Sequence, residues 1–148
     1  MKRILILSDS HGSKSSVENL IMGEKFDCVF FLGDGIKDFE WLDEEEYNII
    51  KVAGNCDYFS TEAKVRVEVV EGVRILITHG DLFGVKHSRL NILKEAKLKN
   101  IDIACFGHTH NQIDEVEEGI RFLNPGAFKN GHYMILEIDK SQQKVFKI

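Results

Sequence analysis

The chain has 148 residues, close to the commonest size of one domain, and we expect residues 1–148 to form a single domain. Its composition, 43% hydrophobic and 29% charged, excludes disordered, collagen-like and membrane-spanning proteins. The net charge of −5 disfavours stable binding to long nucleic-acid duplexes, whose partners usually carry a basic surplus. The apolar stretch Ile4–Leu7 is too short for a signal peptide and no cleavage site follows it, so we expect a cytoplasmic protein without a membrane partner.

Five short, almost continuous apolar runs recur along the first two thirds of the chain. Such runs, unlike strictly alternating patterns, are typical of strands that are buried on both faces of a mostly parallel sheet. This is the pattern of mostly parallel sheets with helices on each side. The runs are Ile4–Leu7, Cys28–Leu32, Ile49–Ala53, Val73–Ile77 and Ile101–Phe106.

Amphipathic patterns between these runs predict three helices, over residues 13–22, 36–45 and 87–99. Residues 64–71 alternate apolar and polar side chains, which predicts a half-exposed strand that turns at Glu71-Gly72 into the next run as a hairpin. Two further strands are expected between residue 132 and the last residue. The pattern is that of an α/β domain whose second half is rich in strands.

Two cysteines and an aromatic cluster are expected in the interior. Cys28 and Cys105 lie in apolar runs, and three distant cysteines without a CxxC pair support neither a disulfide framework nor a zinc ribbon. We therefore expect both to be buried, free thiols. Phe39, Trp41 and Leu42 are expected to be core residues, with a pocket or an interface as the alternative.

Polar residues follow each of the five apolar runs at the point where the run ends. The carboxyl ends of strands in an open α/β sheet form the edge where ligands bind, and the neighbouring glycines allow sharp turns that let side chains converge. His87 and His132 lack such neighbours, and we expect them to be exposed residues at the start of a helix and of a strand. The expected site residues are Asp9, His11, Asp34, Asn55, His79, His108 and His110.

This set combines imidazole nitrogen with carboxylate and amide oxygen, which suits Mn, Fe, Zn, Ni or Co rather than all-oxygen Mg or Ca sites. Seven potential ligands exceed the four of a structural zinc site. The sequence therefore predicts two divalent transition-metal ions, with manganese as the first expectation and Asp34 as the bridging carboxylate. Asp9 and Asp34 would be ordinary helix caps in isolation, but convergence from five strand ends favours a metal site.

The same residues fall into five motifs: Asp9-x-His11, Gly33-Asp34, Gly54-Asn55-x-Asp57, His79-Gly80 and Gly107-His108-Thr109-His110. Together these motifs resemble the signature blocks of the calcineurin-like metallophosphoesterases, and their spacing is similar to that of the compact prokaryotic phosphodiesterases in that superfamily. The resemblance implies two mixed β-sheets packed as a sandwich and flanked by helices, with a dinuclear metal site at the sheet ends. It also implies a tight turn at Asn124-Pro125-Gly126 near the site.

The resemblance further implies a ligand set and a reaction. One metal would bind Asp9, His11, Asp34 and His110, and the other would bind Asp34, Asn55, His79 and His108. The implied reaction is hydrolysis of a small phosphodiester by a hydroxide that bridges the metals. Asn55 would orient the phosphate beside Cys56, and His79 or His108 would donate to the transition-state oxygens.

Two positions depart from the family pattern. Many members carry histidine directly after the ligand asparagine, where it can protonate the leaving group, and this chain has Cys56 there. A thiol is a poor substitute for imidazole, so we expect weak hydrolysis of monoesters. Many members also carry a second histidine after His-Gly, where this chain has Asp81.

Two other functions were weighed against a small-molecule phosphodiesterase. A retromer subunit shares this fold but serves as a protein-binding scaffold with an altered metal set, whereas every ligand position is filled here. Nucleases of double-strand-break repair carry added domains and DNA-binding surfaces, and for 148 residues with an acidic surplus we do not expect a nuclease of long duplexes. The expected substrate is therefore a small phosphate ester, and the sequence leaves a homo-oligomer open.

Overall fold

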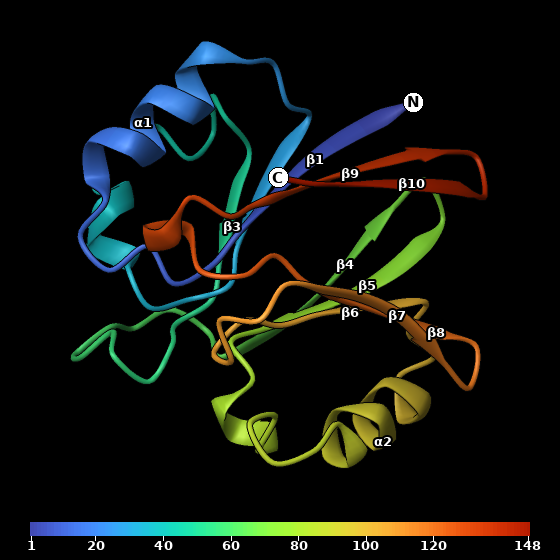
Figure 1. The fold of residues 1–148 in the computed structure, drawn as a ribbon. Helices are drawn as coiled ribbons and strands as arrows, with labels where there is room; N and C mark the ends of the chain where they lie inside the picture. Colours follow the sequence, from blue (N-terminus) through green and yellow to red (C-terminus); the bar gives the residue numbers. More distant parts are fainter.

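The computed structural model describes residues 1–148 as four layers, in the order helix, sheet, sheet, helix (Figure 1). Helix α1 (Lys14–Gly23) covers the outer face of one sheet, and helix α2 (Leu90–Leu98) covers the outer face of the other. This arrangement confirms the predicted sandwich of two mixed sheets flanked by helices. Neither helix has the length and apolar character needed to cross a membrane.

Each sheet has five strands and a parallel centre. The first sheet contains, from edge to edge, β10 (Gln142–Lys147), β9 (Met134–Asp139), β1 (Lys2–Leu7), β2 (Cys28–Phe31) and β3 (Ile49–Lys51). The second contains β4 (Val65–Val70), β5 (Val73–Thr78), β6 (Ile103–Cys105), β8 (Ile120–Asn124) and β7 (Ile113–Glu117). Strands β1, β2 and β3 are parallel in the first sheet, as are β5, β6 and β8 in the second. Six carboxyl ends therefore point to one end of the sandwich.

Successive side chains of β1 alternate between two apolar layers. Ile4 and Ile6 lie in the cluster between the sheets, whereas Leu5 and Leu7 lie in the cluster beneath α1. Because both faces are covered, the strand is apolar at every position rather than at every second one. The predicted parallel, doubly buried strands follow from this packing.

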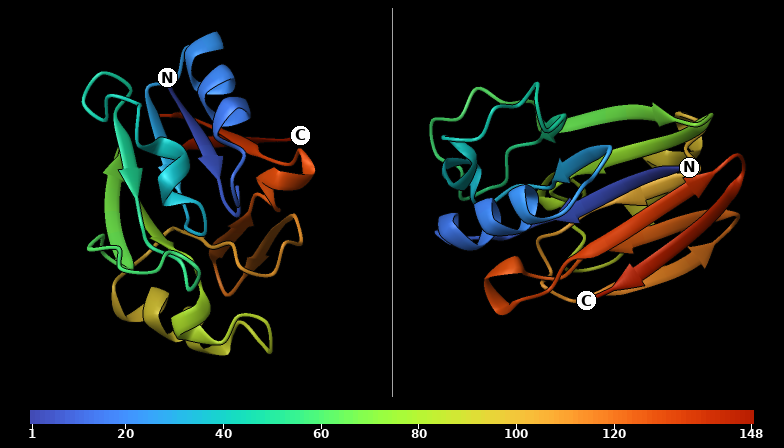
Figure 2. Two further views of the ribbon diagram at one scale, coloured as in Figure 1. Left: turned by 90° about the vertical axis from the view of Figure 1, so that its left-hand side faces the viewer. Right: turned by 90° about the horizontal axis from the view of Figure 1, so that it is seen from above.

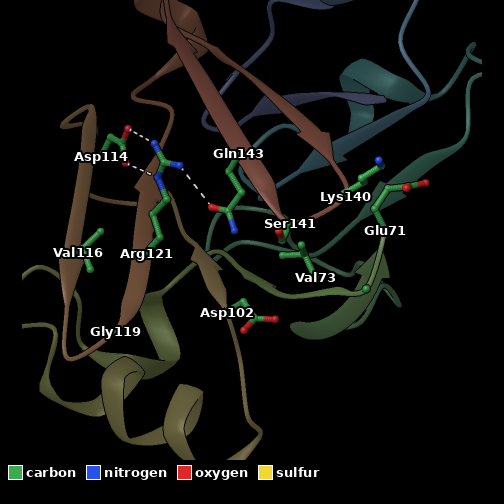
Figure 3. A pocket seen from close by; sticks show the side chains of 11 residues that line it. Glu71, Val73, Asp102, Asp114, Val116, Gly119, Arg121, Lys140, Ser141 and Gln143 are labelled. Atoms are coloured by element: carbon green, nitrogen blue, oxygen red, sulfur yellow. Dashed lines mark hydrogen bonds and ion pairs between the residues drawn. The ribbon is translucent and has the colours of Figure 1, made fainter.

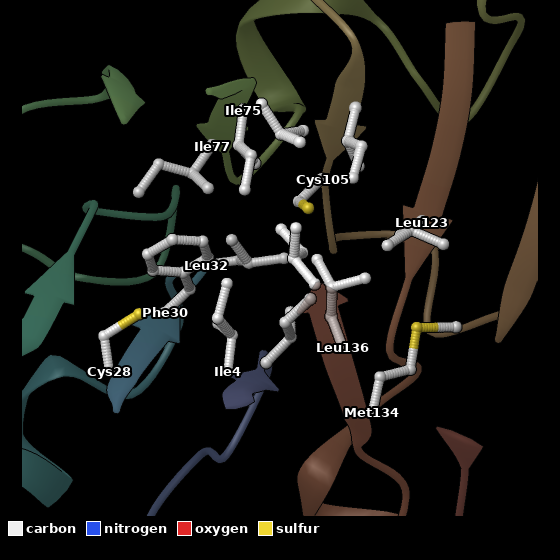
Figure 4. Close-up of a cluster of buried hydrophobic side chains, with 14 of the residues drawn as sticks. Ile4, Cys28, Phe30, Leu32, Ile75, Ile77, Cys105, Leu123, Met134 and Leu136 are labelled. Atoms are coloured by element: carbon white, nitrogen blue, oxygen red, sulfur yellow. The ribbon is translucent and has the colours of Figure 1, made fainter. Parts of the chain in front are cut away.

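The cluster between the sheets contains the two cysteines that were expected inside (Figure 4). Cys28 and Cys105 are buried and free, as predicted. Burial raises the pKa of each thiol to about 12, so neither forms a thiolate near neutral pH.

Two hairpins build the outer part of the second sheet. Strands β4 and β5 are joined by Glu71-Gly72, both with positive φ (50° and 77°), which confirms the predicted hairpin. Strands β7 and β8 are joined in the same way at Glu118-Gly119, with φ of 51° and 80°. This second hairpin was not predicted from the sequence because β7 lies at the edge of the sheet and is mostly acidic.

The predicted helix over residues 36–45 is wrong. The chain forms only a short 3₁₀ helix, η1 (Ile36–Phe39), which is followed by turns. Ile36, Phe39 and Leu42 recur every three residues, the period of a 3₁₀ helix, and all three pack in the layer beneath α1. Trp41 lies off this face and is 75% exposed, so its expected place in the core is also wrong.

Helix α2 is shorter than the predicted helix over residues 87–99. It begins at Leu90 because the preceding residues form turns, and Leu90 is itself exposed. Asn100 follows the helix in the left-handed conformation (φ 55°), in agreement with its predicted place at the helix end. His87 and His132 are exposed, as expected. The chain also has 3₁₀ helices η2 (Asp81–Phe83) and η3 (Phe128–Asn130).

Two carboxylates hold the loops at the carboxyl end of the first sheet. Asp57 accepts four hydrogen bonds of 2.7–3.0 Å from the backbone N–H groups of Asp34, Gly35, Ile36 and Gly54. Asp38 accepts the Ser10 hydroxyl at 2.5 Å and the N–H groups of Gly12 and Ser13 at 3.0 and 3.2 Å. Each carboxylate therefore fixes a loop that follows a different strand from its own.

An ion pair links the strands at the wall of a cavity of about 760 Å³ that the hairpin turns enclose (Figure 3). Arg121 on β8 donates two hydrogen bonds of 2.7 Å to Asp114 on β7, and a third of 3.3 Å to Gln143 on β10. The hydrogen bonds from Arg121 and its charge lower the pKa of Asp114, although partial burial opposes them. The ion pair thus joins two strands of the second sheet, and the hydrogen bond from Arg121 to Gln143 reaches the first sheet.

We predict that the stabilisation from Asp114 disappears in acid. Because its pKa in the folded protein lies below the unfolded value of about 3.9, the contribution is complete above that value and is lost as the pH falls through the folded pKa. Urea unfolding of the wild type and Asp114→Asn should show a difference that is constant from about pH 7 to 5 and shrinks below about pH 4.

Glu95→Gln is the control, since Glu95 pairs with Lys99 on an exposed helix face and its loss should change stability by no more than about 0.5 kcal/mol. A difference between wild type and Asp114→Asn that persisted undiminished at pH 2 would contradict the pairing.

We also predict that Asp57→Asn is strongly destabilising. The amide keeps one acceptor oxygen but turns an NH₂ group toward two of the four N–H donors, so the free energy of unfolding should fall by about 2–4 kcal/mol. Asp43→Asn is the matched control because Asp43 accepts two N–H groups through one oxygen on an exposed loop, and its loss should be about 0.5 kcal/mol or less. Equal melting temperatures for the two variants would show that Asp57 does not hold the loops.

Candidate metal centre

The expected site residues lie on loops at the carboxyl ends of parallel strands, the edge that faces the viewer in the left view of Figure 2. Three loops belong to the first sheet and two to the second, so the site spans both sheets. Asp9 and His11 follow β1, Asp34 follows β2, Asn55 follows β3, His79 follows β5, and His108 and His110 follow β6.

Six of these seven residues form two groups whose nitrogen and oxygen atoms lie within 4.8 Å of one another. The first group is Asp9, His11 and His110, and the second is Asp34, His79 and His108. In the first, His110 Nε2 lies 3.2 Å from Asp9 Oδ1. In the second, His79 Nε2 lies 3.1 Å from both Asp34 Oδ2 and His108 Nδ1.

The two groups adjoin each other through their carboxylates. Asp34 Oδ2, in the second group, lies 3.8 Å from His11 Nε2 in the first. Asp9 Oδ1, in the first, lies 3.9 Å from His79 Nε2 in the second. The donor atoms therefore form one continuous cluster in which a carboxylate oxygen of each group faces an imidazole of the other.

Both carboxylates use one oxygen for the fold and turn the other to the imidazoles. Asp34 Oδ1 accepts the Cys56 N–H at 2.8 Å, while its Oδ2 faces His79. Asp9 Oδ2 accepts the Ser8 hydroxyl at 2.6 Å and the His108 N–H at 3.1 Å, while its Oδ1 faces His11 and His110. The oxygens that face the cluster are thus fixed in direction.

His79 is held in one tautomer. Its Nδ1 lies 2.8 Å from the carbonyl oxygen of Leu32, so Nδ1 carries a proton and donates it, and Nε2 faces Asp34, where a second proton or a metal ion would be bound. Burial lowers the pKa of His79, but the hydrogen bond and charge of Asp34 and the charge of Asp9 raise it more. The same contact lowers the pKa of Asp34 to about 2 against the effect of its burial. The cluster therefore favours a positive charge at its centre.

The donor set fits a transition-metal cation. The Nε2 of His79, the Nδ1 of His108 and the Oδ2 of Asp34 meet at about hydrogen-bond distance. Burial and the nearby charges of His79 and Lys86 lower the pKa of His108, which keeps it in the neutral form that binds metals. Mixed imidazole and carboxylate donors are those of Mn, Fe, Zn, Ni or Co sites.

The backbone at the site is strained. Five of the seven expected site residues have positive φ, a region that residues other than glycine seldom adopt. Their φ values are 55° for Asp9, 42° for His11, 64° for Asp34, 66° for His108 and 64° for His110. Such strain concentrates at functional sites, where the surrounding structure holds it in place.

Close packing of two loops excludes any side chain at the glycines beside the ligands. A Cβ at Gly54 would lie 2.1 Å from Asp34 Oδ1, and a Cβ at Gly107 would lie 1.9 Å from Ser8 Oγ. These positions require glycine because the carboxylates of Asp34 and Asp9 approach the neighbouring backbone directly.

The residues that position this cluster were not predicted from the sequence. Asn124, at the end of β8, is fully buried and donates to the Gly107 carbonyl at 3.0 Å and to Thr109 Oγ at 2.9 Å, which fixes the loop of His108. Its Oδ1 accepts the Gly126 N–H at 2.9 Å, so the expected turn at 124–126 forms next to the site. The signal in the sequence that could have identified Asn124 is its position, because it is a polar residue at the end of a sixth strand.

Three neighbouring positions lie at the margin of the cluster. Asn55 is exposed on the turn after Gly54, where its side-chain amide lies 3.6 Å from Cys56 Sγ, and its role as a ligand stays a prediction. Cys56 is also exposed, and desolvation and the negative charge of Asp34 raise the pKa of its thiol. Asp81, the second departure from the family pattern, lies 3.8 Å from Lys64 Nζ.

Comparison with known proteins agrees with this site. A family model described as the calcineurin-like phosphoesterase superfamily domain matches residues 1–141. The probable metallophosphoesterase YsnB of Bacillus subtilis is 34% identical over 129 residues, which cover 85% of this chain and 75% of YsnB. The phosphodiesterase YfcE of Escherichia coli K12 is 28% identical in an alignment of 155 positions, gaps included, that covers 86% of this chain and 79% of YfcE.

The fold agrees as well. The crystal structure of a predicted phosphoesterase from Streptococcus pneumoniae matches with a TM-score of 0.81 at 26% identity, covering 99% of this chain and 98% of that one. The chain belongs to the calcineurin-like phosphoesterase superfamily, as its five motifs implied.

Proposed function

We propose that this protein is a phosphodiesterase that binds two divalent transition-metal ions, manganese foremost, and hydrolyses small phosphodiesters. The observation that carries the proposal is the pair of adjoining donor groups, with Asp34 Oδ2 facing His79 at 3.1 Å and His11 at 3.8 Å. Membership of the superfamily and the similarity to YfcE, which is named a phosphodiesterase, support it.

Each metal would take the residues of one group. Asp9, His11 and His110 would hold the first ion and His79, Asn55 and His108 the second, with Asp34 shared between them. When bound, the two cations polarise phosphoryl oxygens and lower the pKa of a water nucleophile toward neutrality. The fixed orientation of Asp34 and Asp9 lets both ions bind without reorganising the loops.

His79 and His108, the two histidines expected to donate to the transition state, differ in whether a ring N–H group is available for that hydrogen bond. His79 is fully buried, and its Nδ1–H is already given to the Leu32 carbonyl, so its role is to bind metal. His108 is half-buried and turns Nδ1 toward His79, which leaves its Nε2–H for a phosphoryl oxygen. We therefore assign donation to the transition state to His108 rather than His79, with Asn55 orienting the phosphate.

Cys56 favours diesters over monoesters. It stands where many relatives have an acidic imidazole, and its raised pKa keeps the thiol protonated and a weak acid. A diester also brings less negative charge than a monoester to a site that contains Asp9 and Asp34. Esters whose leaving group departs without a proton should therefore be the better substrates.

The alternative is a scaffold of the same fold that binds proteins rather than hydrolysing esters. A scaffold has no need for directed ligand atoms or for five strained residues at one edge of the sheets. The oriented donor atoms of the two groups therefore favour the enzyme.

We predict that Asp34→Asn abolishes metal-dependent hydrolysis while the fold remains. The amide oxygen can still accept the Cys56 N–H, but an NH₂ group replaces the oxygen that faces His79 and His11. Hydrolysis of bis-(p-nitrophenyl) phosphate with Mn²⁺ should fall by at least about 100-fold. Calorimetry should show fewer Mn²⁺ ions bound than in the wild type.

The melting temperature provides the control for this variant. Mn²⁺ should raise that of the wild type by mass action, chelator should reverse the rise, and Asp34→Asn should respond less. Wild-type turnover by Asp34→Asn at equal metal loading would exclude the bridging role. A wild type that neither binds Mn²⁺ nor responds to it in the melt would favour the scaffold.

We predict that Cys56 sets the preference between ester classes. Because a positioned acid contributes about 10²–10⁴-fold to departure of a basic leaving group, Cys56→His should raise kcat/KM for alkyl monoesters more than for aryl diesters. Cys56→Ala should leave the aryl diester rate almost unchanged. All three proteins are compared at one pH and metal concentration, and an inactive Cys56→Ala enzyme would show that the thiol itself is catalytic.

A further inference from the structure

A cavity of about 750 Å³ adjoins the metal centre. Its wall includes His11, of the first donor group, and Cys56, whose backbone binds Asp34. Ile36, Tyr58 and Phe59 supply its apolar lining. A group placed in this cavity would therefore lie next to a phosphate bound at the metal centre.

Two aromatic rings on this wall face solvent. Phe59 is 104% exposed and Tyr58 is 74% exposed, although large aromatic side chains usually contribute to a core. Exposed rings contribute nothing to folding through burial. At the mouth of a cavity they offer flat surfaces on which another planar group can stack.

Phe59 is also held in an unfavourable backbone conformation. Its φ is 62°, and it is the one apolar residue among the non-glycine residues with positive φ. The others outside the metal centre are Asn48, Glu71, Asn100, Glu118 and Lys140. No local interaction of a bulky ring offsets the strain of the left-handed region, so the presence of Phe59 there favours a function for its ring.

The loop that carries both rings is anchored at its base and in its middle. The Ala53 N–H donates to the Ala63 carbonyl at 2.9 Å and closes the loop. Asp57, directly before Tyr58, is fixed by its four backbone hydrogen bonds. Tyr58 and Phe59 thus directly follow Asp57, the residue that fixes the turn of Asp34. This short connection sets the distance of the two rings from the metal centre.

We propose that Tyr58 and Phe59 bind a planar aromatic group carried by one ester arm of the substrate, either the base of a nucleoside or an aryl group. The proposal rests on the phosphodiesterase function and names the substrate class. A volume of about 750 Å³ is within the range of small-molecule sites and holds a nucleoside. The wall carries three carboxylates, Asp38, Asp57 and Glu62, against the single cation Lys37, which favours an uncharged second ester arm.

The test uses Phe59→Gly, which removes the ring and at the same time relieves the positive φ. Its melting temperature should equal or exceed that of the wild type, so loss of binding cannot be attributed to unfolding. Trp41→Ala is the matched control, because Trp41 is 75% exposed and is not part of the cavity wall.

Three diesters that share the leaving group p-nitrophenolate and differ in the other ester arm isolate the effect of that arm on KM. These are thymidine 5′-(p-nitrophenyl) phosphate, bis-(p-nitrophenyl) phosphate and methyl p-nitrophenyl phosphate. In Phe59→Gly the KM of an aromatic diester should rise roughly fivefold or more, the lower end of base stacking on an aromatic ring. The kcat of each substrate and the KM of the methyl ester should stay within about twofold, as should all values for Trp41→Ala.

A rise confined to the thymidine ester identifies the natural arm as a nucleoside, and one confined to the bis-aryl ester identifies it as an aryl group. Equal changes for the methyl ester and the aromatic esters, or no change for any ester, would overturn the proposal.

A binding measurement keeps this test independent of hydrolysis. In NMR titrations of the protein loaded with diamagnetic Zn²⁺, adenosine 5′-monophosphate should shift the amide signals of residues 56–61, and ribose 5-phosphate should not. The base-dependent shifts should vanish in Phe59→Gly and persist in Trp41→Ala. If no ester is hydrolysed but these shifts occur, the ring site stands and the phosphodiesterase assignment fails. If the two phosphates give the same shifts, the ring site fails whatever the activity.

Discussion

The metal centre depends on contacts that cross from one sheet to the other at their carboxyl edge. Asp9, from the first sheet, accepts the backbone N–H of His108 from the second, and His79, from the second, donates to the carbonyl of Leu32 in the first. Neither contact can form unless the sheets are packed in one register. The apolar cluster between the sheets therefore stabilises the fold and also sets the relative positions of the two donor groups.

The charges and lone pairs at the carboxyl edge of the sheets explain why a cation is expected there. Lone pairs of His79 and His108 and an ionised oxygen of Asp34 converge, and a proton or a metal has to lie between them for the arrangement to be favourable. Five left-handed residues at the same edge add strain. Metal binding offsets both costs, since ligands that are already oriented lose little further freedom when the ion binds.

The sequence was sufficient to predict the parallel strands and the cluster at their ends because both depend on local patterns. A doubly buried strand is apolar throughout, and the polar residue after it has to lie at the strand end. The helix predicted over residues 36–45 failed because Ile36, Phe39 and Leu42 follow a period of three, which differs little from that of an α-helix over so short a segment.

The positioning role of Asp57 was beyond any such pattern. It arises from hydrogen bonds to backbone N–H groups that are 21 to 23 residues away, and side-chain identity carries no record of which backbone groups are near. One loop, closed by Ala53 and Ala63, consequently combines this anchor with Asn55, Cys56 and the exposed ring of Phe59. Since the other expected ligands lie on separate loops, changes near Phe59 can alter substrate choice while the carboxylates and imidazoles stay in place. The proposed selection of the substrate thus depends on one loop, which it shares with the expected ligand Asn55, while the two donor groups lie on the other loops.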